Sequence, residues 1–126
     1  MAGPIAQGVG MIQWDDVPVY VHRQPVDFRK SINGLSVLVQ ESMALEVFSR
    51  SVFVFGNRTR NKIKILYWDK TGFCLWYKRL EKDKFKWPRR GDAVLSLTHE
   101  QFDWLLRGLD IEKLQPHTEK YFFSAN

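Results

Sequence analysis

Positive charge and aromatic rings are concentrated in the middle of this chain. Residues 57–90 hold twelve Lys or Arg against three acids, whereas the other ninety-two residues hold seven bases and eleven acids. The same segment holds seven aromatic residues. Cationic side chains attract nucleic-acid phosphates, and flat rings offer surfaces on which bases stack. The segment therefore predicts a nucleic-acid-binding surface, although a charge cluster of this kind can also be no more than a solvated face.

Catalytic chemistry has much weaker support. Two-metal nucleases need carboxylates that converge within a few ångströms, whereas Asp69 and Asp83 are explained as turn residues. Cys74 has no histidine near it in sequence, and the three histidines are scattered without metal-ligand spacing. The chain also lacks a Gly-rich phosphate loop of the P-loop type. We therefore expect a protein that is not an enzyme and that uses no metal or cofactor.

Length and composition limit the organisation of the chain. A length of 126 residues with 44% hydrophobic residues predicts one domain with a packed core. A single cysteine, no long apolar run and no signal-like start favour a protein of the reducing cytoplasm with no membrane partner. We expect a flexible leader at 1–13, a single domain at 14–114 and a C-terminal tail at 115–126.

Short apolar runs between turn residues predict strands. The fold class that they indicate is α+β: a single small domain with a mainly antiparallel sheet of about five strands and two packed helices. The candidate strands cover 17–22, 51–55, 62–68, 73–80, 84–87 and 93–97.

Two helices are predicted by caps and by apolar spacing. Asp27 is a good N-cap for the first, whose apolar residues from Phe28 to Met43 fall on one face at 3.6 residues per turn. Thr98 and Gln101 form a capping-box pattern that opens the second helix, and Gly108 or Asp110 closes it.

The segment 62–80 reads as a hairpin whose register decides the shape of the basic surface. A three-residue loop with Gly72 in the left-handed conformation would place Trp68 opposite Cys74 and Lys64 opposite Lys78. One face of the hairpin would then carry lysines around Trp68 and Trp76, and the other face would be the core. A four-residue loop would instead pair Lys64 with Tyr77.

Arg29 and Lys30 fall in the first turn predicted for the first helix. Cations are unfavourable at that end of the macrodipole, but a helix N-terminus with adjacent cations is suited to binding phosphate. The alternative is that the two side chains point outward or pair with Asp27.

Three strings resemble one known family. They are VDFRKSINGLSVLV (26–39), VFVFGNRTRNKIKILYWDKTGFCLWYKRLEKDKFKWP (52–88) and LTHEQFDWLLRGLDI (97–111). They resemble the TnpB accessory protein of the insertion-sequence-66 family of bacterial transposons, a second-open-reading-frame-like protein. The resemblance implies a helper of transposition that is not the catalyst, and it makes transposon DNA the polyanion of choice.

Together these observations predict binding to DNA, either transposon ends or non-specific duplex, mostly through phosphate contacts. Two arginine pairs, one in the loop after residue 56 and one after residue 88, would clamp phosphates at opposite ends of the hairpin. The candidate residues are Arg29, Lys30, Arg58, Arg60, Lys62, Lys64, Trp68, Trp76, Lys78, Arg79, Lys82, Lys84, Lys86, Arg89 and Arg90.

A second interpretation is a protein-interaction adaptor that recruits or regulates the transposase without binding DNA directly, or that forms a homodimer. Trp104 lies opposite the apolar stripe of the second predicted helix. It would therefore anchor a protein interface, unless it packs within the domain.

Overall fold

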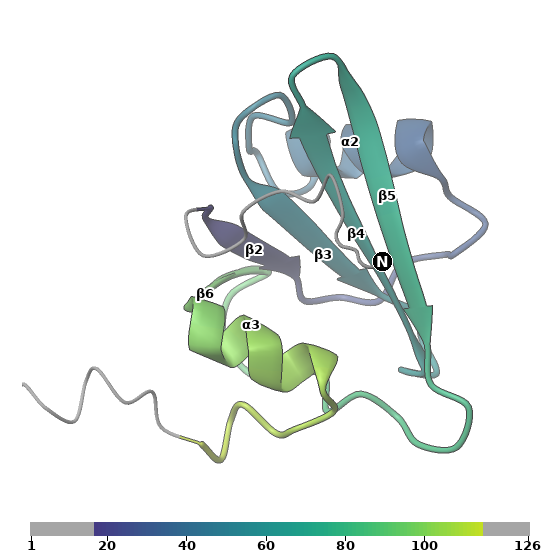
Figure 1. The fold of residues 1–126 in the computed structure, drawn as a ribbon, viewed down its shortest axis with the longest axis vertical. Coiled ribbons are helices and arrows are strands. Elements are labelled where there is room, and N and C mark those ends of the chain that lie inside the picture. Colours follow the sequence, from purple (N-terminus) through teal and green to yellow (C-terminus); the bar gives the residue numbers. More distant parts are fainter. Residues whose placement is uncertain (1–16, 115–126) are drawn as a thin grey trace, which may run out of the picture.

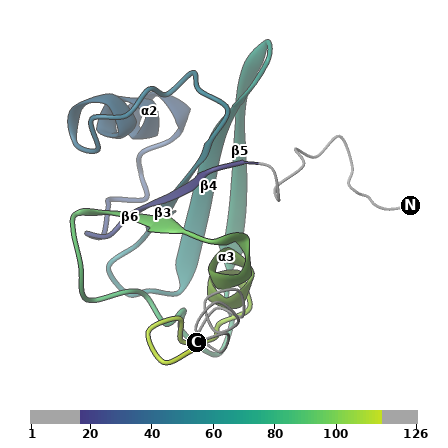
Figure 2. The same ribbon diagram turned by 90° about the vertical axis from the view of Figure 1, so that its left-hand side faces the viewer.

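Two helices lie on opposite faces of a five-stranded sheet in the computed structural model, which describes residues 17–114 (Figures 1 and 2). The strand order is β5-β4-β3-β2-β6. The strands are β2 (Val19–His22), β3 (Val52–Gly56), β4 (Lys62–Asp69), β5 (Gly72–Arg79) and β6 (Val94–Leu97), and the helices are α2 (Ile32–Glu41) and α3 (His99–Leu106). The α+β class predicted from the sequence is confirmed. The predicted leader and tail lie outside the described residues.

The β2–β3 pair is parallel, and the other neighbouring strands are antiparallel. α2 lies in the connection between β2 and β3, because parallel neighbours need a crossover rather than a tight turn. β3 is the central strand, and all five of its residues are buried. Its sequence VFVFG is continuously apolar because both of its faces are covered.

Each face of the sheet carries its own core. The core under α2 consists of Leu35, Val39, Met43, Val47, Phe53, Phe55 and Leu66. The core under α3 includes Val19, Val21, Val52, Val54, Ile63, Ile65, Tyr67, Phe85, Trp87, Leu97, Phe102, Leu105 and Ile111. The sequence-based expectation that the β4–β5 hairpin has a single core face is therefore wrong.

The first helix begins later than predicted. Its N-cap is Ser31, and Asp27 instead begins a separate turn that precedes the helix. The Asp27 carboxylate accepts the Arg29 backbone N–H at 2.9 Å, and the Asp27 carbonyl accepts the Lys30 N–H at 3.0 Å. Asp27 satisfies backbone donors as expected, but in this turn rather than in the helix.

The second helix confirms its predicted start and end. The Thr98 hydroxyl accepts the Gln101 backbone N–H at 3.0 Å, and the Gln101 side chain accepts the Thr98 N–H at 2.9 Å. This reciprocal pair is the capping box. Gly108 has a φ of 84° just beyond the helix, a conformation that glycine adopts without steric cost.

The β4–β5 register differs from the primary prediction. Trp68 pairs with Phe73, Asp69 pairs with Gly72, and Lys64 pairs with Tyr77, as in the alternative register. Lys70, not Gly72, takes the left-handed conformation, with a φ of 56°. This register places Phe73 and Leu75 against the core under α2, so burial on both faces decides it over turn preference.

Residues 84–87 do not form a strand, contrary to prediction. Phe85 and Trp87 are buried in the core under α3, and the Phe85 N–H donates to the Arg60 carbonyl at 2.7 Å. The Trp87 indole donates to the Arg23 carbonyl at 2.7 Å. A Cβ at Gly56 would lie 3.0 Å from the Trp87 ring, so glycine allows this close packing. The F-x-W alternation therefore anchors a loop by its rings rather than by strand pairing.

Lys78 ties the edge strand β5 to α3. Its Nζ donates to the Leu106 carbonyl at 3.0 Å, at the C-terminal end of the helix where a cation is favourable. We expect Lys78→Met, which keeps the apolar stem, to lower the free energy of unfolding by about 1 kcal/mol in urea denaturation. The matched variant of an exposed lysine, Lys82→Met, should change it by less than about 0.5 kcal/mol. Equal effects of the two substitutions would contradict the structural role of Lys78.

Tyr67 makes the stability of the fold depend on pH in alkaline solution. Burial, and then the neighbouring Cys74 thiol, raise the pKa of Tyr67 from 10.0 to about 12. Because the folded state holds this proton more tightly than the unfolded chain, the stabilisation is complete below pH 10 and is lost as the pH rises toward 12. Denaturation at a series of alkaline pH values should show this loss, and Tyr67→Phe should weaken the dependence. An unchanged dependence in the variant would assign the effect to another group.

Candidate nucleic-acid interface

The topology brings the cationic loops to one end of the sheet. β2, β3 and β5 finish at this end, and β4 and β6 begin there. We call it the basic end and define it as residues 57–62 and 79–92, found at the lower right of Figure 1. These residues hold nine Lys or Arg against three acids. Segments separated in sequence therefore form one cationic region.

The loop between β3 and β4 is held by the side chain of Asn57. Its Oδ1 accepts the backbone N–H groups of Asn61 at 3.1 Å and Lys62 at 3.0 Å. Its Nδ2 donates to Thr59 Oγ1 at 3.0 Å and to Asn61 Oδ1 at 2.8 Å. This network fixes the backbone that carries the exposed Arg58, so the cation is presented from an ordered loop.

The loop between β5 and β6 is anchored from two sides. The Arg23 side chain donates to the carbonyls of Asp92 at 3.0 Å and Arg89 at 3.2 Å. The Glu112 carboxylate accepts the backbone N–H groups of Arg89 at 3.0 Å and Arg90 at 3.1 Å. Both anchors use the backbone of the arginine pair and leave its side chains exposed.

The two arginine pairs lie at the same end of the hairpin, so their predicted placement at opposite ends is wrong. Arg60 of the first pair and both arginines of the second line one hollow of about 260 Å³, whereas Arg58 lines a different hollow. The lining residues of the shared hollow are Arg60, Lys86, Trp87, Arg89, Arg90, Asp110 and Glu112. The reason is that the loops before β4 and after β5 lie at the same end of an antiparallel pair. Four cations converge there on a site that two carboxylates partly neutralise.

Lys64 and Lys78 do not share a surface, because the observed register puts them on opposite faces of the sheet. Lys64 Nζ donates to the carbonyls of Phe28 at 3.0 Å and Lys30 at 2.8 Å and lies 4.9 Å from the centroid of the Phe28 ring. Desolvation, and then the neighbouring Lys62, lower the pKa of Lys64. Both lysines thus bind backbone carbonyls of their own chain, and the predicted opposed pair is wrong.

Trp68 and Trp76 also lie on opposite faces, so the predicted surface of lysines around both rings is wrong. Trp68 contacts Phe48 and Phe73 edge-on, with ring centroids 5.0 Å away in each case. Trp76 packs against the core under α3. Trp68 belongs to the hairpin tip, at the end of the sheet remote from the basic end, and neither tryptophan is fully buried.

Arg29 and Lys30 precede the first helix and are not in its first turn, contrary to prediction. Arg29 forms an ion pair with Asp27 at 2.6 Å, which is the alternative that the sequence left open. The hydrogen bonds from Arg29 lower the pKa of Asp27 to about 2. The two cations therefore lie before the N-cap Ser31 rather than in the first turn where the prediction placed them, and phosphate binding by Arg29 and Lys30 stays a prediction.

The other predicted residues differ in exposure. Arg79 pairs with Glu81 at 2.9 Å, and this contact raises the pKa of its guanidinium. Trp104 is half-buried and packs against the core under α3, as in the alternative interpretation of its position. Lys82, Lys84 and Lys86 are exposed in the loop after β5.

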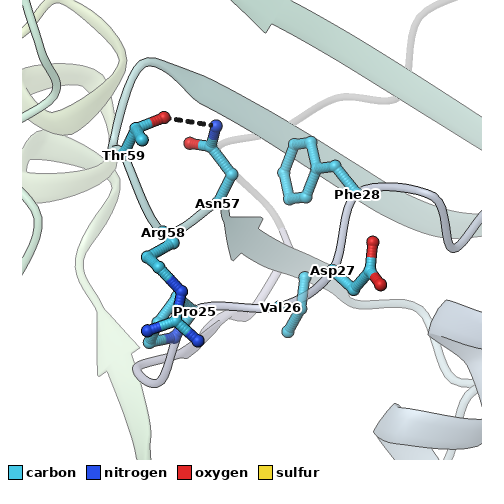
Figure 3. Close-up of a pocket in the computed structure, with 7 residues that line it drawn as sticks. All are labelled: Pro25, Val26, Asp27, Phe28, Asn57, Arg58 and Thr59. Atoms are coloured by element: carbon cyan, nitrogen blue, oxygen red, sulfur yellow. Dashed lines mark hydrogen bonds between the residues drawn. The ribbon is translucent and has the colours of Figure 1, made fainter.

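Sequence reasoning missed two aromatic residues beside the basic end, Phe28 and Tyr77. Phe28 and Arg58 line a hollow of about 400 Å³ together with Pro25, Val26, Asp27, Asn57 and Thr59 (Figure 3). Phe28 and Tyr77 line a second hollow, of about 270 Å³, with Lys62 and Lys64. The alternative hairpin register could have identified Tyr77, because pairing Lys64 with Tyr77 places the tyrosine ring next to Lys64 and Arg79.

The described residues contain no group of three His, Cys, Asp or Glu side chains arranged to hold a metal ion. No helix of this part of the chain has the length and apolarity needed to cross a membrane.

Comparison with known proteins gives one family. The family model described as IS66 Orf2-like protein, TnpB of IS66, matches residues 17–116. Uncharacterized protein y4jC of Sinorhizobium fredii (strain NBRC 101917 / NGR234) is 37% identical over 92 residues, which cover 73% of this chain and 79% of that protein. Uncharacterized protein y4hO of the same strain is 30% identical over 95 residues, which cover 75% and 83%. No solved structure matches the chain. The chain therefore belongs to the IS66 Orf2-like family, and this membership suggests an accessory protein of transposition.

Proposed function

We propose that this protein is a non-catalytic accessory protein of bacterial DNA transposition that binds DNA through its basic end. The observation that supports the proposal is the convergence of the loops at 57–61 and 80–93, with Lys62 and Arg79 beside them, on one end of the sheet. Nine cations against three acids form a region suited to a polyanion.

The positions of the cations favour contacts with phosphates rather than with base edges. The basic residues of this region lie on loops and strand ends, and the polar side of α3 carries the acids Glu100 and Asp103. α2 has no basic residue between Ile32 and Glu41. A helix that reads the major groove would need donors and cations on its exposed side. The proposed binding is therefore weakly selective for sequence and strongly dependent on salt.

A titration of labelled duplex DNA over a salt series tests this proposal. If six to ten phosphates are contacted, affinity should fall by about 10³–10⁵ between roughly 50 and 200 mM salt. Transposon-end duplex and random duplex should give similar slopes, because phosphates carry no sequence information. Absence of binding to both duplexes at low salt would contradict the proposal.

Single-charge variants locate the contact surface in the same titration. Arg58→Gln and Lys86→Gln each remove one exposed cation at the basic end, and each should reduce the log–log salt slope by about 0.9. Lys70→Gln removes one exposed cation at the opposite end of the β4–β5 hairpin, and it should leave the slope unchanged. An equal change in all three variants would mean that binding follows net charge alone.

A second candidate function is an adaptor that binds the transposase of the same element. The observation in its favour is Phe48, which is 53% exposed and lies against Trp68 and Phe73 at the end of the sheet remote from the basic end. An exposed aromatic supported by other rings is typical of an interface anchor. Trp104 is less suited to this role because it packs within the domain.

The adaptor function predicts that Phe48→Ala abolishes capture of the transposase in a pull-down while DNA affinity is retained. The expected selectivity follows from the position of Phe48, which is remote from the cations of the basic end. Arg58→Gln is the matched control and should leave capture intact. If the Phe48→Ala variant captures the transposase as well as wild type does, the surface around Phe48 is not the adaptor interface.

A further inference from the structure

Two hollows beside the basic end share the ring of Phe28 as a wall. The first reaches from Phe28 to Arg58 and Thr59 in the loop after β3 (Figure 3). The second reaches from Phe28 to Lys62 and Tyr77 on the β4–β5 hairpin. The Asn57 N–H also donates to the Lys62 carbonyl at 3.4 Å, so the two linings are joined along the chain. We call the combined surface the Phe28–Tyr77 strip.

The strip combines cations with aromatic rings. Arg58 and Lys62 line its two hollows, and Arg79 is the cross-strand partner of Lys62 on the same face. The acid in its lining, Asp27, is bound by the Arg29 guanidinium at 2.6 Å. Arg79 is paired with Glu81 at 2.9 Å, so each of the two carboxylates beside the strip is already bound by an arginine. The exposed Arg58 and the neighbouring Lys62 keep the strip cationic.

Tyr77 is an unusual residue for the place that it occupies. It lies on the edge strand β5, and it is 48% exposed on the face that α2 covers further along the same strand. Leu75, two residues earlier on the same face, packs into the core under α2, whereas Tyr77 faces Lys64 across the strand pair. The Tyr77 ring therefore offers a flat apolar surface with Lys64 opposite it on β4 and Arg79 two residues further along the same face of β5.

We propose that the Phe28–Tyr77 strip binds single-stranded DNA, with unpaired bases stacked on Tyr77 and Phe28 and phosphates held by Arg58, Lys62 and Arg79. The inference deepens the proposed function and rests on it. Rings combined with a cationic track are the general means of holding a single strand, because every base presents a π-face once it is unpaired. The bases of a duplex are stacked on one another, so a duplex would use the cations but not the rings.

Fluorescence anisotropy with three labelled ligands of equal length tests the inference. They are a thymidine strand of about 16 nucleotides, a duplex, and a strand of abasic sites that keeps the phosphates. Tyr77→Ala should weaken binding of the thymidine strand about 5- to 150-fold, the range expected for loss of one stacked base. It should leave binding of the duplex and of the abasic strand within about twofold of wild type.

Two further variants separate stacking from other effects. Tyr77→Phe keeps the ring and should bind the thymidine strand as wild type does. Phe48→Ala removes a comparably exposed ring, 53% against 48%, from the opposite end of the sheet and should have no effect on any ligand. Thermal unfolding of each variant checks that the fold is intact.

Two outcomes overturn the inference in distinguishable ways. If wild type binds the duplex but Tyr77→Ala weakens all three ligands equally, or none of them, the strip is not a base-stacking site although the proposed function stands. If wild type binds none of the ligands at low salt, the proposed function fails together with the inference.

Discussion

The pairing of β4 with β5 determines on which side of the molecule each of their side chains lies. Successive residues of a strand point to opposite faces, so a shift of one residue in one strand exchanges its two sets of side chains. In the observed register Leu66 faces Leu75 and Trp68 faces Phe73, which gives the side of α2 a continuous apolar layer. Tyr77 and Arg79 continue the same face beyond that layer, next to Lys62. The composition of the candidate surface therefore follows from the packing that covers the other half of the strands.

The structure also separates cations that hold the fold from cations that are exposed on its loops. Lys64 and Lys78 bind backbone carbonyls, and Arg23 holds the loop that contains Arg89 and Asp92. Such residues contribute to stability, and their charge is partly used within the protein. Arg58 and Lys86 differ from these residues, because their side chains are exposed and form no hydrogen bond or ion pair with residues 17–114. A count of charges in the sequence cannot make this distinction, because it depends on which carbonyls the fold brings within reach.

The features predicted correctly from the sequence are those that depend on residues close together in the chain or on overall periodicity. The capping box of Thr98 and Gln101, the left-handed Gly108 and the α+β class were all correct, since each depends on residues near one another or on overall periodicity. The hairpin register was wrong because turn preference favoured Gly72 in the left-handed position, whereas packing on two faces placed Lys70 there. The prediction of a strand around Phe85 was wrong, because alternation of apolar and polar residues occurs both in strands and in loops that are anchored by their aromatic rings. The basic end itself required the strand order, which brings distant loops to one end of the sheet.

In the proposed function, DNA contacts the molecule at the basic end. Amide chemical shifts measured by NMR while a duplex is added report contacts along the whole chain without substitutions. The largest changes should fall in residues 57–62 and 79–92, with smaller changes around the hairpin tip at Trp68 and Phe73. Changes concentrated at the hairpin tip, with the basic end unaffected, would contradict it.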